Sequence, residues 1–444
     1  MSRPANSSKA ARTWQTVGLR PRYLSVPILT TPNYAIFGTD KNVCATLLLI
    51  AALSLIAAPL ASAQGVAPTR PAPAATTSST NSPATTPRAA PATRPPATTP
   101  ARSPAPAPAP APAAAPAAPK FNKSAYIDLV AYGKTLGFTA SWTKTPDATQ
   151  LTLKKPGMKL DFTNDHIEFF ANAQRIFAGT PIRAYQNTLW ISRVDADALL
   201  APIAAPATLT APAAPAAARP IPNLRVIAID AGHGGNDKGT ANPRLKVDEK
   251  TFTLDTANRL KILLEQKGYK VILTRPQDKL VELGDRPAIA AKFGADLLVS
   301  IHYNAIENYN EAQTISGVEV YRFTPRNQPP LKRANPSNDD RKANPSDANA
   351  CWNTLAAFQM HRALLAALRV PDRGLKHEKY AVLRLATMPA ILVEPGFLTN
   401  DAEAKKIMTP AYRQKIAEAM AAGIQAYADT LATLRKQQQQ QQHG

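Results

Sequence analysis

The sequence contains little cysteine and lacks several familiar functional motifs. Its two cysteines are Cys44, inside an apolar run expected to leave with a signal peptide, and Cys351, so no internal disulfide is expected. There is no H-E-x-x-H motif, serine nucleophile elbow, P-loop or dinucleotide-binding glycine fingerprint. Zinc-finger spacing and a basic-aromatic RNP stretch are also missing, which argues against a nucleic-acid partner.

What the sequence does contain is an excess of positive charge and an apolar N-terminal run. The net charge of +21 would suit an anionic lipid, nucleic acid or wall polymer. Residues 43–63 are apolar, follow basic residues and close on Ala-Ser-Ala, which predicts a secretory signal peptide over residues 1–63. The protein would then contact the membrane only transiently and act in the periplasm or cell envelope. An uncleaved membrane anchor is the alternative.

Low-complexity segments divide the rest of the chain. Residues 64–119 and 203–222 are rich in alanine and proline, which predicts extended linkers without a packed core. Residues 435–444 are rich in glutamine and are expected to form a disordered tail.

Residues 120–202 are predicted to form a small α+β domain, a possible wall-binding or positioning module. A helix is expected over Tyr126–Leu136, followed by a meander of short strands. The segment loosely resembles the small domain at the start of copper amine oxidases, which bacterial wall proteins reuse. It carries no candidate catalytic set.

Residues 223–434 alternate short apolar strands with amphipathic helices. This alternation predicts an α/β fold with a mostly parallel sheet flanked by helices. The expected strands are Arg225–Asp230, Lys270–Thr274, Leu297–His302, Gly317–Phe323, Ala381–Leu383 and Ala390–Glu394, and the expected helices are Phe252–Gln266, Arg286–Phe293, Cys351–Leu368 and Ala411–Leu434.

Two histidines and two glutamates lie at predicted strand ends or in the loops beyond them: His233, Glu249, His302 and Glu394. Ligands of open α/β sheets bind at these strand ends. Two imidazoles and one carboxylate form a catalytic zinc ligand set, although the ligand types also allow other divalent ions. A nearby free carboxylate can take a proton from water and pass it to a leaving amine, and Glu394 suits that role.

The pieces around these residues also carry a family resemblance. They are VIAIDAGHGGNDKGT, DEKTFTLDTANRLKILLEQKGYKVILTRPQD, LGDRPAIAAKFGADLLVSIHYNA, GVEVYR, DRGLK and YAVLRLATMPAILVEPGFLTN. The stretch Leu224–Leu434 resembles the zinc-dependent N-acetylmuramoyl-L-alanine amidases of bacterial cell walls. The resemblance implies zinc held by His233, Glu249 and His302, with Glu394 as the catalytic glutamate. The implied substrate is the amide between N-acetylmuramic acid and L-alanine in peptidoglycan.

Further residues are candidates for holding the substrate. Bidentate pairing with stem-peptide carboxylates is expected for arginines near strand ends, and an amide near His302 could orient the substrate. These candidates are Asn304, Arg275, Arg286, Arg373 and Arg384. The polar, proline-containing segment 324–350 is expected to be a mobile loop rather than a blocking helix.

The sequence therefore predicts a secreted zinc amidase for cell-wall turnover or septum splitting. Its positive charge would favour attraction to anionic wall polymers. Two alternatives remain open: a non-catalytic wall-binding protein that keeps this fold, and a zinc hydrolase with a different substrate.

Overall fold

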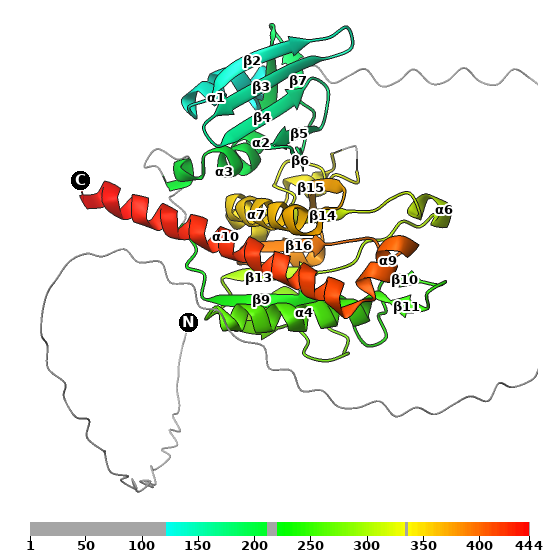
Figure 1. Ribbon diagram of the computed structural model, residues 1–444. Coiled ribbons are helices and arrows are strands. Elements are labelled where there is room, and N and C mark those ends of the chain that lie inside the picture. Colours follow the sequence, from blue (N-terminus) through cyan, green and yellow to red (C-terminus); the bar gives the residue numbers. More distant parts are fainter. Residues whose placement is uncertain (1–120, 211–219, 334–335, 444) are drawn as a thin grey trace, which may run out of the picture. The chain divides into compact units, whose positions relative to one another are not determined.

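The computed structural model describes residues 121–210, 220–333 and 336–443 (Figure 1). The expected signal peptide and the 64–119 linker lie outside the described residues, as do residues 211–219 of the second linker. In the part of the chain that is described, no helix combines the length and the apolar character needed to cross a bilayer.

A mixed, largely parallel sheet forms the centre of the 223–434 region (Figure 1). Its strands lie in the order β12-β9-β13-β16-β14-β15. The first four are parallel to one another, β14 runs antiparallel to β16, and β15 is parallel to β14. The strand bounds are β9 Val226–Ala231, β12 Lys270–Leu273, β13 Leu297–Ile301, β14 Val318–Phe323, β15 Asp372–Glu378 and β16 Ala390–Glu394.

Helices pack on both faces of this sheet because alternate strand residues point to opposite sides. On one side Ile229 and Val299 join a core with the long helices α4, α7 and α10. On the other side Ala228 and Leu298 join a smaller core with α5 and α8. The fold class predicted from the sequence is therefore confirmed. The helix bounds are α4 Glu249–Gln266, α5 Asp285–Lys292, α6 Tyr309–Ala312, α7 Ala350–Leu368, α8 Ala381–Arg384, α9 Asp401–Ile407 and α10 Pro410–His443.

In the 223–434 region and the C-terminal tail, two local predictions were wrong and one strand was missed. Ala381–Leu383 is helical, within α8, because an apolar run this short fits either a strand or a helix. The strand of this region is instead β15, whose mostly polar sequence gave no apolar signal. The glutamine run continues α10 to His443 instead of forming a disordered tail, because glutamine favours helix and no glycine or proline interrupts it.

The 120–202 region begins with a 3-10 helix, Lys123–Ala125, which is followed by a strand and then an α-helix. The expected helix over Tyr126–Leu136 is replaced by β1, Tyr126–Asp128, and by α1, Leu129–Thr135, which Asp128 caps through hydrogen bonds from Val130 N and Ala131 N. The other elements are β2 Thr139–Lys144, β3 Thr149–Lys155, β4 Met158–Thr163, β5 Glu168–Ala171, β6 Gln174–Phe177, β7 Arg183–Tyr185, β8 Thr188–Ser192, α2 Arg193–Asp195, a π-helix Ala196–Leu200 and α3 Ala201–Ala204.

The meander β2 to β6 continues the central sheet. Strand β6 pairs in parallel with β15 at Ile176 and Leu375, which gives one sheet of 11 strands. Asp372 of β15 reinforces the junction: its Oδ2 accepts from Arg175 N at 2.7 Å, and its Oδ1 lies 3.0 Å from Nε2 of the buried His361. We infer that the two regions support each other's stability.

Replacing Asp372 with alanine should therefore lower the free energy of unfolding by about 1–3 kcal/mol, because buried donors lose their acceptor. Burial raises the pKa of Asp372, but the hydrogen bond and charge of His361, together with hydrogen bonds from Arg175 N and Gly374 N, outweigh it and leave the pKa below the ordinary 3.8. The wild-type contribution is thus complete above pH 3.8 and is lost as the pH falls through the depressed pKa. Urea unfolding from pH 3 to 7 measures both effects. Asp339→Ala, at an exposed position, is the control; an equal loss in the two variants would contradict the inference.

Candidate metal centre

Three of the four predicted site residues come together at one edge of the sheet. His233, Glu249 and His302 each offer a ligand atom, and these atoms all lie within 4.8 Å of one another. His233 Nε2 is 3.1 Å from Glu249 Oε2, and His302 Nδ1 is 3.0 Å from Glu249 Oε1. The group could hold a metal ion.

The sheet brings the two histidines together because β9 and β13 are parallel neighbours. Ala231 pairs with Ile301, and Gly232 N donates to Ile301 O at 3.0 Å, so both chains leave the sheet side by side. A Cβ on Gly232 would lie 2.4 Å from the His302 ring. Only glycine therefore lets the two loops approach this closely.

Glu249 is the most enclosed member of the group, with 2% of its surface exposed. Its Oε2 accepts from Thr240 N at 2.8 Å and its Oε1 from Tyr303 N at 2.9 Å. Burial alone raises the pKa of this carboxyl, but hydrogen bonds with His233 and His302 outweigh burial and hold the pKa well below its usual value. Glu249 is therefore an anion, as a metal ligand must be.

Asp237 supports His233 from the other side of the ring, a role that the sequence reasoning missed. Its Oδ2 lies 2.8 Å from His233 Nδ1. A carboxylate on one ring nitrogen leaves the other nitrogen free for a metal, a pairing common in metal sites. Burial lowers the pKa of His233, but Glu249 and Asp237 together raise it above its usual value. The spacing His-x-x-x-Asp was the available signal.

Glu394 ends β16, the strand beside β13. His302 N donates to Val393 O at 3.0 Å. Glu394 is the next residue after Val393, so it follows the residue that bonds the backbone of His302. Its Oε2 is buried and has no hydrogen-bond partner among the described residues. Burial, followed by the charges of Glu249 and Glu319, raises the pKa of Glu394 well above its usual value. A carboxylate with an unused oxygen and raised proton affinity can act as a base.

Glu319, which the sequence reasoning also missed, lies opposite Glu394 on the antiparallel strand β14. Its carboxylate accepts from Asn304 Nδ2 at 2.7 Å, from Tyr321 Oη at 2.6 Å and from Lys376 Nζ at 2.5 Å. Asn304 is thereby fixed near Glu394. Strand alternation in GVEVYR was the only sequence signal that these carboxylates would be neighbours.

The predicted arginines separate into buried and half-buried residues. Arg275 and Arg286 have 1% and 2% of their surface exposed and bond to backbone carbonyls, so their positions do not fit contact with a stem peptide. Arg373 is half-buried, with its Cζ 5.8 Å from the Phe397 ring centre and its Nε 3.8 Å from Glu319 Oε1. Arg384 is half-buried on α8.

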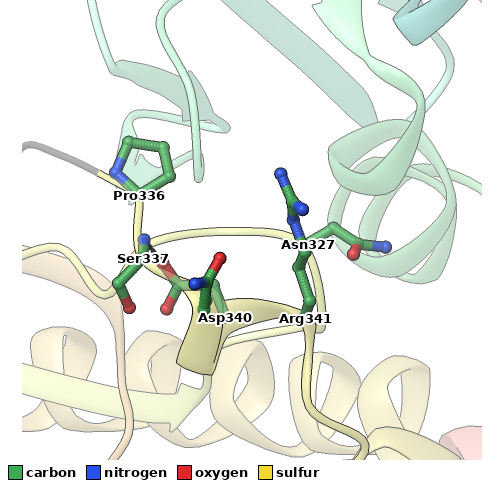
Figure 2. A pocket seen from close by; sticks show the side chains of 6 residues that line it. Asn327, Pro336, Ser337, Asp340 and Arg341 are labelled. Carbon is green, nitrogen blue, oxygen red and sulfur yellow. Dashed lines mark hydrogen bonds between the residues drawn. The ribbon is translucent and has the colours of Figure 1, made fainter.

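Within the segment 324–350, the described residues before α7 form no α-helix. They form two 3-10 helices, Asn338–Arg341 and Pro345–Asn349. A hollow of about 540 Å³ lies in this segment, lined by Asn327, Pro336, Ser337, Asn338, Asp340 and Arg341. Figure 2 shows the side chains that line it. None of the four predicted catalytic or metal-binding residues lines it, so it is separate from the metal centre.

Sequence comparison with known proteins identifies the family. The profile of the Amidase_3 family, described as N-acetylmuramoyl-L-alanine amidase, matches residues 227–426. The uncharacterized protein YqiI of Bacillus subtilis is 32% identical over 213 residues, which cover 48% of this chain and 89% of YqiI. The chain belongs to the N-acetylmuramoyl-L-alanine amidase family.

Two further cell-wall relatives match over a smaller share of their own length. The probable cell wall amidase LytH of Staphylococcus saprophyticus is 31% identical over 204 residues, 46% of this chain and 58% of LytH. An uncharacterized cell wall amidase of Bacillus anthracis is covered over 35% of its length. The crystal structure of an amidase from Clostridium difficile 630 is 34% identical, covers 47% of this chain and 98% of its own, and has a TM-score of 0.38.

Proposed function

We propose that this chain is a zinc-dependent hydrolase that cleaves the amide bond between N-acetylmuramic acid and L-alanine in peptidoglycan. The observation that carries the proposal is the convergence of His233, Glu249 and His302 beside Glu394, a carboxylate with an unused oxygen. The family and its cell-wall relatives support the substrate class. A peptidoglycan substrate would mean that the protein works in the cell envelope, in turnover of the wall or splitting of the septum.

The donor set fits zinc. Two imidazoles and one carboxylate leave one tetrahedral position open, and Glu249 is already held as an anion by Thr240 N and Tyr303 N. Bound zinc would supply Lewis acidity, which polarises an amide carbonyl and acidifies water.

Glu394 would carry the proton in the hydrolysis. Its free Oε2 accepts a proton from the attacking water, and the same carboxyl then donates it to the nitrogen of the departing L-alanine. The raised pKa of Glu394 favours this exchange because a more basic carboxylate takes a proton more readily. Glu319 would stay out of the transfer because three donors already occupy its oxygens.

Arg373 and Asn304 are the predicted substrate-binding residues best placed to hold the stem peptide. Both are close to Glu319, opposite the catalytic candidate. Arg373 keeps donors that its 3.8 Å approach to Glu319 does not use, and stem peptides carry carboxylates.

Replacing Arg373 with alanine should raise KM for a muropeptide roughly tenfold while kcat changes little, since a charged hydrogen bond contributes about 1.5–3 kcal/mol. Steady-state kinetics on matched substrates with a free or an amidated second stem residue measures this. Arg362→Ala, at an exposed position on α7, is the control. An unchanged KM for both substrates would remove Arg373 from the binding site.

Digestion of purified sacculi tests the proposed activity. Mass spectrometry should find intact stem peptides starting at L-alanine and glycan strands with bare lactyl groups. Chelation should stop the reaction and added zinc should restore it. Peptides cut at internal bonds would indicate a different zinc hydrolase, and binding without release of either product would indicate a wall-binding protein.

A further inference from the structure

A pair of buried guanidinium groups lies beneath the loop that carries His233. Arg275 Nε donates to Ala231 O at 2.8 Å, and its Nη2 donates to Gly232 O at 2.9 Å. The same Nη2 also donates to Lys250 O at 2.9 Å, next to Glu249 at the start of α4. One side chain therefore joins the segments that carry two of the three ligands.

Arg286, in the first turn of helix α5, holds the same loop. Its Nη1 donates to Ala231 O at 2.9 Å and its Nη2 donates to His233 O at 3.1 Å. Asp230, fully buried, anchors this guanidinium through an Oδ1–Nη1 hydrogen bond of 2.8 Å. Asp230 is itself fixed by hydroxyl donors from Thr274 at 2.6 Å and Ser300 at 2.7 Å. Together the two arginines bond every carbonyl from residue 231 to residue 233.

The loop needs such support because its backbone is strained. His233 has a φ of 62°, in the left-handed region that residues with a Cβ seldom adopt. A strained conformation persists only when its surroundings determine it. Hydrogen bonds to three successive carbonyls fix the peptide planes on both sides of His233, and these planes set where its ring points.

We propose that Arg275 and Arg286 are positioning residues that hold the His233 loop in its metal-binding shape before the ion arrives. They act through His233 and do not touch the substrate or the ion. The inference rests on the proposed metal site and goes beyond it, because it assigns two buried arginines to metal affinity. Their fixed, forked donors are what the three carbonyls require, and a lysine ammonium cannot reproduce them.

Zinc affinity tests the proposal directly. Competition with a chromophoric chelator gives the zinc dissociation constant of the full chain and of Arg275→Lys and Arg286→Lys. We expect the constant to rise roughly 10- to 100-fold in each variant, the range typical when a group that orients a ligand is removed.

The matched control is Arg413→Lys. Arg413 is also buried and bonds both a carboxylate, Asp255, and a carbonyl, that of Ile407, but none of the metal ligands. Arg413→Lys should lower the thermal stability of the zinc-free protein, as Arg275→Lys and Arg286→Lys do. Its zinc affinity should nevertheless stay within about twofold of wild type. A role in stability alone would move all three affinities equally.

Thr253→Val is a second variant that tests the same proposal if an arginine variant does not fold. The Thr253 hydroxyl donates to Gly232 O at 2.8 Å and accepts from Arg275 Nη2 at 3.0 Å, and valine removes both hydrogen bonds at nearly constant volume. We expect a smaller rise of the zinc dissociation constant, about three- to tenfold, because the two arginines keep their own bonds to the loop carbonyls. Wild-type affinity in the folded variants of Arg275, Arg286 and Thr253 would overturn the proposal. Failure of the wild type to bind zinc would overturn the metal site as well.

Discussion

Glu394→Gln should lower kcat for peptidoglycan fragments by roughly 10²- to 10⁴-fold while zinc stays bound, the range that a general base contributes. Glutamine keeps the shape of the side chain but cannot accept the proton of water. The three ligand atoms come from other residues, so the ion should remain. Steady-state kinetics and zinc content, measured on the same preparation, check both parts of the expectation.

Stability separates this loss from misfolding. Burial raises the pKa of Glu394, so the ionised carboxylate costs the metal-free fold stability, and that cost grows as the pH rises from the ordinary pKa of 4.5 to the raised pKa and stays constant above it. The neutral glutamine has no such cost. Metal-free Glu394→Gln should therefore be at least as stable as wild type above neutral pH. Glu418→Gln, at an exposed position on α10, should change neither activity nor stability. Retention of more than a tenth of kcat in Glu394→Gln would end its role as the base.

His302→Ala should abolish both zinc binding and hydrolysis. The change removes one of two imidazoles, and Glu249 and His233 alone hold a divalent ion weakly. We expect zinc affinity to fall by more than about 100-fold, beyond the usual effect of residues that only orient a ligand. Activity should drop to background at zinc concentrations that saturate wild type. Chelator competition and sacculus digestion measure the two losses. A variant that keeps zinc and half the activity would show that His302 is not a ligand.

Acid should weaken zinc binding in the wild type as well. Glu249 and Asp237 raise the pKa of His233, and a metal can bind only its neutral ring. Zinc affinity should therefore increase as the pH rises through this raised pKa and level off above it. Asp237→Asn should shift the rise to lower pH, because it removes one of the charges that hold the proton. Isothermal titration at several pH values tests the shift.

Much of this site could be predicted because it depends on strand ends. His233, His302 and Glu394 follow apolar runs that form parallel neighbours, so their convergence needs only the strand order. Glu249 precedes an amphipathic helix whose start faces the same edge. The chain turns sharply at His233, which the structure shows in the left-handed region.

The rest could not be predicted because sequence does not show burial or long-range pairing. The sequence does not separate Arg275, which follows β12, and Arg286, in the first turn of α5, from Arg373 at the start of β15. In the structure Arg275 and Arg286 are enclosed and bond the backbone. Only the packed loop of residues 231–233 distinguishes them. Strand β15 escaped notice because its pairing with β14 and β6 comes from backbone hydrogen bonds, which a polar sequence does not reveal.

Anomalous diffraction at the zinc edge, from crystals of the zinc-loaded protein, tests the central claim most directly. The account predicts a single strong peak about 2.0–2.2 Å from ligand atoms of His233, Glu249 and His302, with Glu394 nearby but not coordinated. An ion bound elsewhere, or one that takes Glu394 as a ligand in place of a histidine, would contradict it.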